Sequence, residues 1–154
     1  MFKKILITTD GSALAAQAAN AGIDFARSVG AQVIALSVIE PFVTTSAFDG
    51  LASGYGVDPV DIDEALAKNA AKYVSQIIER AKEAGVHAEP CVVSGFNVAE
   101  AIVNTAAEQG CDLIFIGSHG RSGFSRLLLG SVTAKILPLS TTAVLVYRAQ
   151  DDKA

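Results

Sequence analysis

Residues 113–131 read LIFIGSHGRSGFSRLLLGS. The first four of these residues are all apolar, which is typical of a strand that is covered on both faces of a sheet. A glycine-rich segment begins at Gly117, and Gly130 with Ser131 has the pattern of a helix start. A buried strand that turns through glycines into a helix indicates an open parallel α/β sheet.

Four other apolar runs are also typical of strands covered on both faces of a sheet, and segments with helical patterns lie between them. Runs that are apolar throughout are typical of parallel strands, which need helical crossovers between them. The fold class that follows is α/β: one domain over residues 1–154, with an open five-stranded parallel sheet in the order 3-2-1-4-5. Helices would cover both faces in a three-layer sandwich of Rossmann or flavodoxin type. We expect strands near residues 5–7, 33–39, 88–93, 113–116 and 143–147, and helices near residues 13–29, 61–84, 97–108 and 131–137.

Residue types at the helix ends support these boundaries. Asp10 or Ser12 is suited to cap the helix that begins at residue 13, because both side chains accept hydrogen bonds from free backbone N–H groups. Asp61 and Glu64 have the spacing of a capping box. Gly30 is a suitable C-terminal stop for the first helix.

Composition excludes several classes of function. The chain has a net charge of −4, and its 12 Lys and Arg residues are scattered without a basic run. A nucleic-acid-binding surface usually has a basic patch, so we expect no nucleic-acid partner. No apolar run approaches the ~20 residues of a membrane helix, and the apolar stretch at the N-terminus stops after Ile7, too early for a signal peptide. We therefore expect a soluble, cytoplasmic protein without membrane insertion.

The two cysteines, Cys91 and Cys111, are far apart in the sequence and belong to no CxxC pair. Both fall in or beside apolar runs, which favours buried reduced thiols over a metal site. We expect no metal ligands in the chain.

Residues 41–60 have neither helical nor strand periodicity and include three glycines. A loop of this length in a compact domain is often functional or disordered. A lid or partner site and an ordinary flexible connection are equally good interpretations of this segment.

Unusual loops follow two of the expected strands. TTDGS, residues 8–12, follows the first strand, and GSHGRSG, residues 117–123, follows the fourth. In an open parallel sheet, ligands bind beyond the carboxyl ends of the strands where the strand order reverses, and these two strands would be neighbours there. Glycines let the backbone approach an anion closely, and the helix start at Gly130 and Ser131 adds unpaired N–H donors. The two loops therefore predict a phosphate-binding crevice.

The spacing of these glycines differs from the two best-known phosphate motifs. The patterns GxxxxGK[ST] and GxGxxG are both missing from the loop. Instead, Gly117-x-x-Gly120, nine residues and then Gly130-Ser131 resembles the ATP-binding motif of the universal stress protein family, G-2x-G-9x-G-[ST]. KKILITTDGS at the start and AVLVYR near the end are also similar to that family. The resemblance covers nearly the whole chain.

The resemblance implies that the glycine motif contacts phosphates and ribose, that Asp10 contacts the nucleoside, and that the backbone of Val38 meets adenine. Some members of the family lack the glycines and bind no ATP, whereas this chain has all of them and resembles the binding subclass. The implied cofactor is ATP, with Mg²⁺ held by its phosphates. The residues that we expect to contact nucleotide are Thr8, Thr9, Asp10, Val38, Ile116, Gly117, His119, Gly120, Arg121, Gly130, Ser131, Val132 and Thr133.

Other roles stay open for some of these side chains. Asp10 is also suited to cap a helix or to hold Mg²⁺, and we follow the resemblance in placing it at the nucleoside. His119 is a candidate general base, but we expect its loop to be exposed and no carboxylate is placed in the sequence to orient it, so a place near the phosphates is favoured. Arg121 is better placed than Arg126 to clamp a phosphate.

The last expected strand, residues 143–147, would lie at an edge of the sheet without an inward charge, and exposed apolar edges tend to find partners. The resemblance also implies dimerisation through this strand. We therefore expect a homodimer or a higher oligomer. Residues 140–142 read STT where many members of the family have Cys-Pro, a departure that is remote from the expected site.

The resemblance implies an ATP-binding regulatory protein of the stress response, whose occupancy biases its dimer or an unidentified protein partner. One alternative is a slow Mg²⁺-dependent ATPase. Fast hydrolysis needs a residue that positions water, and Asp10 lies at the nucleoside end, so we expect at most weak turnover. The other alternative is an interaction module that binds no nucleotide.

Overall fold

The computed structural model describes residues 1–41, 59–119 and 128–149. Five parallel strands form one sheet in the order β3-β2-β1-β4-β5, which confirms the predicted fold class and strand order. The strands are β1 (Lys4–Thr8), β2 (Gln32–Ile39), β3 (Ala88–Ser94), β4 (Leu113–Gly117) and β5 (Ala143–Tyr147). The helices are α1 (Ala13–Val29), α2 (Pro59–Glu83), α3 (Val98–Glu108) and α4 (Ser131–Leu139).

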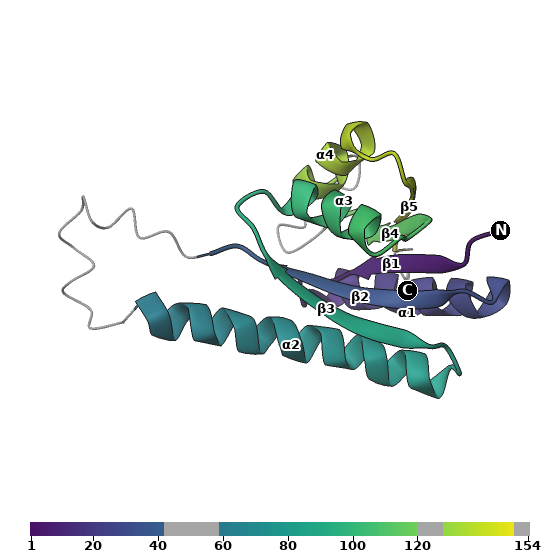
Figure 1. Ribbon diagram of the computed structural model, residues 1–154, viewed down its shortest axis with the longest axis horizontal. Coiled ribbons are helices and arrows are strands. Elements are labelled where there is room, and N and C mark those ends of the chain that lie inside the picture. The colour runs from purple at the N-terminus through teal and green to yellow at the C-terminus, as the bar shows by residue number, and fades with distance from the viewer. Residues whose placement is uncertain (42–58, 120–127, 150–154) are drawn as a thin grey trace, which may run out of the picture.

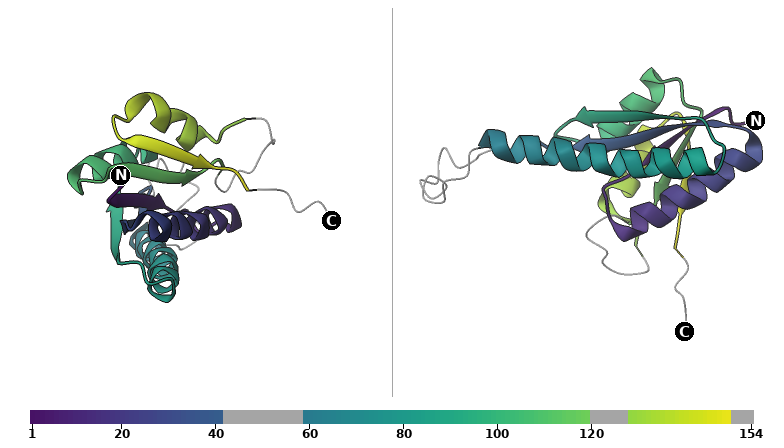
Figure 2. Two further views of the ribbon diagram at one scale, coloured as in Figure 1. Left: turned by 90° about the vertical axis from the view of Figure 1, so that its right-hand side faces the viewer. Right: turned by 90° about the horizontal axis from the view of Figure 1, so that it is seen from below.

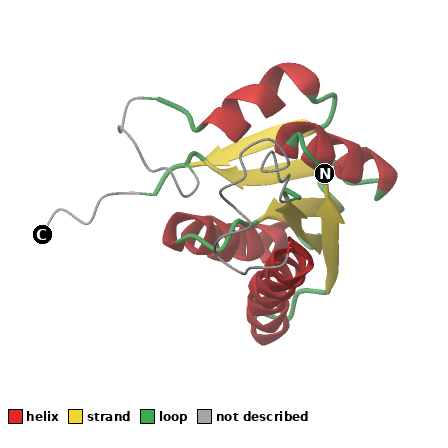
Figure 3. Ribbon diagram, turned by 90° about the vertical axis from the view of Figure 1, so that its left-hand side faces the viewer, coloured by secondary structure: helices red, strands yellow, loops and turns green. Residues whose placement is uncertain are grey.

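Helices cover both faces of the sheet (Figure 1). The pair α1 and α2 lies on one face, and the pair α3 and α4 lies on the other. Figure 2 shows α1 and α2 crossing their face next to each other. Figure 3 looks along the sheet and shows helices on either side of the strands. Within the described ranges, no helix has the length and apolarity needed to cross a membrane.

The residues of β1 and β4 point alternately into two separate cores. Ile5 and Phe115 pack against α1 and α2, whereas Leu6 and Ile114 pack against α3 and α4. All four side chains are buried. A strand with a core on each side has no position for a solvated side chain, because successive residues face opposite sides of the sheet. This is why the central strands are continuous apolar runs in the sequence.

The structure separates the roles of the two candidate caps of α1. The hydroxyl of Ser12 accepts a hydrogen bond from the backbone N–H of Ala15 at 3.1 Å, so Ser12 is the N-cap. Asp10 stabilises the turn before the helix, because its Oδ1 accepts a hydrogen bond from the backbone N–H of Ser12 at 2.9 Å. The helix ends as predicted at Gly30, whose φ of 70° is left-handed and suits a residue without a side chain.

Helix α2 begins two residues earlier than expected, and the prediction that Asp61 and Glu64 form its capping box is wrong. The helix starts at Pro59, so Asp61 lies inside its first turn. Proline suits the first helical position because its ring holds a helical φ and its missing N–H has no helical partner there. Helix α4 also runs two residues beyond its expected end, through Pro138. The predicted loop at residues 41–60 lies outside the described residues except at its ends.

Both cysteines are free thiols, with Cys111 buried and Cys91 half-buried. Burial raises the pKa of Cys111 to about 11, and it also raises the pKa of Cys91. Because the thiolate is the reactive and metal-binding form, both side chains are poorly suited to chemistry at neutral pH.

Gly22 lets α1 approach the sheet closely. A Cβ atom at this position would lie 2.9 Å from Cδ1 of Ile7 and 3.1 Å from Cδ1 of Phe115. We expect Gly22→Val to lower the free energy of unfolding by about 1–3 kcal/mol, because the new methyl groups overpack the core. Gln17→Val adds the same side chain to the exposed face of α1 and is the matched control. Urea denaturation should show a large loss for Gly22→Val alone, and equal losses would contradict the packing argument.

Candidate functional site

A cavity of about 720 Å³ opens at the carboxyl edge of the sheet. Its volume falls within the range of small-molecule sites, roughly 300–1,000 Å³. Of the residues predicted to contact nucleotide, Gly120 and Arg121 lie outside the described part of the chain, as does Arg126. All the others line this cavity: Thr8, Thr9, Asp10, Val38, Ile116, Gly117, His119, Gly130, Ser131, Val132 and Thr133.

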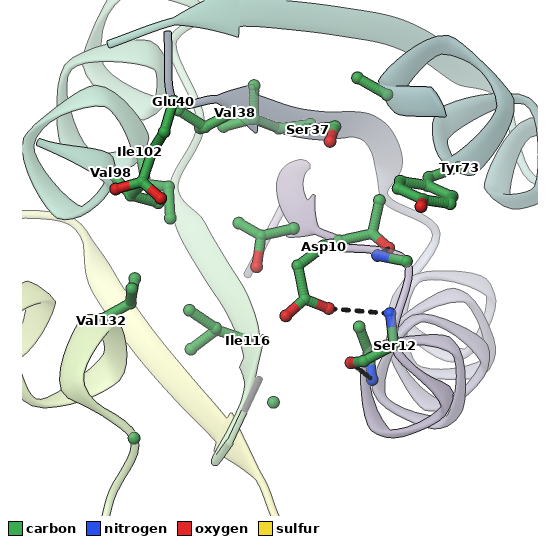
Figure 4. Close-up of a pocket in the computed structure, with 18 of the residues that line it drawn as sticks. Asp10, Ser12, Ser37, Val38, Glu40, Tyr73, Val98, Ile102, Ile116 and Val132 are labelled. Atoms are coloured by element: carbon green, nitrogen blue, oxygen red, sulfur yellow. Dashed lines mark hydrogen bonds between the residues drawn. The ribbon is translucent and has the colours of Figure 1, made fainter. Parts of the chain in front are cut away.

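The turn after β1 brings a carboxylate to the cavity (Figure 4). Asp10 accepts the backbone N–H of Ser12, and Oγ1 of Thr9 accepts the backbone N–H of Gly11 at 3.1 Å. The backbone N–H of Thr9 donates to the carbonyl oxygen of Leu36 in β2 at 2.9 Å. These hydrogen bonds hold the turn against the neighbouring strand, and they fix the Asp10 side chain at the cavity wall.

Hydrogen bonds also join the two described parts of the glycine motif. The backbone N–H of Gly130 donates to the carbonyl oxygen of Ser118 at 2.7 Å. The hydroxyl of Thr133 donates to the carbonyl oxygen of Gly117 at 3.0 Å. The backbone N–H of Ser118 donates to the carbonyl oxygen of Tyr147 at 2.8 Å, which ties this turn to β5. Residues that are distant in sequence are thereby held together at one end of the cavity.

Helix α4 begins at this end of the cavity without a side-chain cap. Its N-cap residue is Gly130, which has no side chain to accept a hydrogen bond. The N-terminal N–H groups of a helix have no partners within it. By contrast, Ser12 caps α1 and Asn97 caps α3 through side-chain oxygens. Among the described residues, no side chain caps the start of α4, which presents first-turn N–H groups without a partner inside the helix and the positive end of a helix dipole, a combination that suits an anion.

His119 lies at the same end of the cavity and is half-buried. Its Nδ1 is 3.1 Å from Oγ of Ser118. Its Nε2 is buried and has no hydrogen-bond partner within the part of the chain that the structure describes. The expectation that this loop residue is exposed is therefore wrong for the imidazole, which is turned inward beside Ser118. A buried nitrogen without a partner is costly, so a hydrogen-bonding ligand atom would stabilise it.

The charged side chains at the described walls of the cavity do not favour an anion. Asp10 and Glu40 line it, and no Lys or Arg does among the lining residues that are described. In residues 1–41, 59–119 and 128–149, no three His, Cys, Asp or Glu side chains gather to hold a metal ion. At the end of the cavity where α4 begins, the donors include the N–H groups of its first turn and the side chains of Ser131 and His119.

Sequence reasoning missed the walls that α2, α3 and the end of β2 contribute. Leu66 and Ala70 recur at helical spacing in the sequence, but this spacing could not show that their face of α2 reaches the strand ends. The missed lining residues in these walls are Leu36, Ser37, Ile39, Glu40, Leu66, Asn69, Ala70, Tyr73, Val98 and Ile102.

Comparison with known proteins agrees with the fold and the motif. The model of the universal stress protein family matches residues 1–148. The chain belongs to this family. The universal stress protein YxiE of Bacillus subtilis is 37% identical over 151 residues, which cover 96% of this chain and 100% of the relative.

Solved structures of universal stress proteins superpose on the whole chain. The structure of MJ0577, a universal stress protein of Methanocaldococcus jannaschii, has a TM-score of 0.78 and 28% identity, with 99% of each chain covered. A universal stress protein solved in complex with cAMP has a TM-score of 0.66 and 24% identity, covering 97% of this chain and 98% of that one. The universal stress protein fold is therefore shared over the full length.

The contribution of the hydrogen bond from Thr133 to Gly117 to the stability of the turn after β4 can be tested. Thr133 is 2% exposed. We expect Thr133→Val to lower the free energy of unfolding by about 1–3 kcal/mol, because the carbonyl oxygen of Gly117 loses a buried partner. Thr133→Ser keeps the hydroxyl and should lose less. If urea denaturation gives the same loss for both variants, this hydrogen bond does not stabilise the turn.

Proposed function

We propose that the cavity binds ATP and that this universal stress protein acts as a nucleotide-dependent regulatory protein. The observation that carries the proposal is the convergence on one cavity of Asp10, the described residues of the glycine motif and the uncapped start of α4. The cAMP complex of a related protein supports an adenine nucleotide as the class of ligand.

In the proposed complex, the phosphates lie at the start of α4. The first-turn N–H groups of α4, the hydroxyl of Ser131 and Nε2 of His119 are donors that suit phosphate oxygens. The buried Nε2 of His119 supports this orientation, because it has no partner among the described residues and a phosphate oxygen would accept its hydrogen bond. Gly120 and Arg121 belong to the same proposed phosphate site.

The nucleoside lies at the opposite end, beside Asp10 and the end of β2. A carboxylate accepts hydrogen bonds from ribose hydroxyls or from the amino group of a base. Val38, Ile116 and Val132 line the cavity with aliphatic side chains, which suit the apolar face of adenine. Thr8 and Thr9 complete this part of the proposed contact set.

We further propose that Mg²⁺ is carried by the phosphates and that the protein holds ATP with at most weak hydrolysis. Hydrolysis needs a group that orients water at the γ-phosphate. Asp10 is bonded to Ser12 in the turn after β1, at the end that we assign to the nucleoside. The proposed role is therefore regulation by occupancy.

Ser131→Glu tests the phosphate site without weakening the helix. A carboxylate in the first turn of α4 favours the helix dipole but repels phosphate. We expect Mg²⁺-ATP at 100 times its Kd to stabilise the natural protein by about 2.7 kcal/mol, and Ser131→Glu to lose this effect. Ala134→Glu adds the same charge to an exposed position of α4 outside the cavity, and it should keep the stabilisation. Differential scanning calorimetry with and without ATP measures all three proteins.

Equal ATP stabilisation of the natural protein and Ser131→Glu would contradict the phosphate assignment. No stabilisation of the natural protein at millimolar ATP would instead favour an interaction module that binds no nucleotide. Chromatography of the incubated ATP reports on the hydrolytic alternative, because steady conversion to ADP would show turnover.

We also propose that the protein forms a homodimer through β5. The two edge strands of the sheet differ in the residues that oppose pairing with a strand of another chain. β3 contains Glu89 and Pro90, and a charge and a residue without an N–H both block the addition of a strand. β5 reads AVLVY and has neither. In α4, the helix that precedes β5 in the chain, Leu137 and Leu139 are 44% and 47% exposed.

Ala143→Lys, at an exposed position of β5, tests the dimer interface. We expect the natural protein to have about twice the 15.9 kDa mass of one chain, and the variant to shift toward the monomer, because a charge on an edge strand opposes pairing. Val92→Lys adds the same charge to β3, at the opposite edge, where Val92 is 40% exposed, and it should leave the mass unchanged. Sedimentation equilibrium measures the mass of all three proteins. A monomeric natural protein would contradict the proposal.

A further inference from the structure

Tyr73 lies where α2 meets the turn that carries Asp10 (Figure 4). Gly11, the next residue in the turn, has a φ of +79°, and a Cβ atom built on it would overlap the ring of Tyr73. The hydroxyl-bearing end of the ring therefore packs directly on the backbone of the turn. This close approach fixes the position of the ring relative to the Asp10 side chain.

The ring of Tyr73 forms part of the wall of two cavities. On one side is the main cavity, and on the other is a small cavity of about 60 Å³ between α1 and α2. Asn20, Gln76 and Ile77 line only the small cavity. The ring is half-buried, so it separates the two spaces and still presents surface to the main cavity.

Tyr73 belongs to a face of α2 that turns toward the main cavity. Leu66, Asn69 and Ala70 share this face at helical spacing and line the same cavity. Tyr73 is the sole Phe, Tyr or Trp among the described lining residues. Figure 4 shows Ile102 across the cavity from Tyr73, with Asp10 between them. A flat ring system held at Asp10 would thus have an aromatic wall on one side and an aliphatic wall on the other.

We propose that Tyr73 is a specificity-determining residue, and that the base of the bound nucleotide packs against its ring. The inference rests on the proposed nucleotide site and adds a wall from α2 to it. Stacking gains energy from the overlap of the two ring systems, so the larger purine gains more than a pyrimidine. Tyr73 therefore favours ATP over CTP, which carries the same ribose and triphosphate on a single-ring base.

The test compares the affinities of ATP and CTP in four proteins by isothermal titration calorimetry. Tyr73→Ala removes the ring, and we expect its Kd for ATP to rise on the order of tenfold, with a smaller rise for CTP. Tyr73→Phe keeps the ring and should have the same ratio of ATP affinity to CTP affinity as the natural protein. Ile77→Ala removes a buried side chain one turn further along α2, outside the main cavity, and controls for loss of stability.

The outcomes separate this inference from the function on which it rests. If the natural protein binds ATP but Tyr73→Ala keeps its affinity, or loses ATP and CTP affinity by the same factor, the role of Tyr73 is overturned and the nucleotide site stands. If Ile77→Ala changes the ATP-to-CTP ratio as much as Tyr73→Ala does, the effect comes from the helix and the inference is also overturned. If the natural protein binds neither nucleotide, both proposals fail.

Discussion

The parallel pairing of β1 with β4 is the constraint on which the site depends. Ile5 lies opposite Leu113, and the carboxylate of Asp112 accepts the backbone N–H of Lys3 at 2.8 Å, which aligns the two strands at their starts. Because the strands run in the same direction, the turns that follow them emerge together at the carboxyl edge. The strand order reverses at this pair, so chain connections lead away from it on both sides and leave a crevice.

The walls of this crevice are held in place by the protein itself. Hydrogen bonds from Gly130 to Ser118 and from Thr133 to Gly117 hold the start of α4 against the turn that follows β4. The bond from Ser118 to Tyr147 connects the same turn to β5. If the proposed phosphate site moved, this hydrogen bond would therefore transmit the movement to β5, the strand that we propose to pair in the dimer.

Local signals predicted most element boundaries, and they failed where two signals competed. α1 spans the expected residues 13–29, because Ser12 and Gly30 act through bonds to their immediate neighbours. Asp61 was expected to cap α2, but Pro59 starts the helix and places Asp61 inside it. The spacing of the glycine motif identified one end of the cavity. Gly117 and Gly120 are close to each other in the sequence, and so are Gly130 and Ser131. Tyr73 was missed, because nothing near it in the sequence shows that it packs on Gly11.

The sequence by itself determined the sheet, the order of its strands and the residues at two of its turns. Continuous apolar runs require burial on both faces, and that requirement acts residue by residue along the chain. The packing of the helices on the sheet sets which helix face closes the cavity and which polar atoms lack a partner among the described residues. The inward turn of His119 and the approach of α2 to Asp10 depend on contacts between elements far apart in the chain. Such contacts follow from how whole layers pack, and no local pattern encodes them.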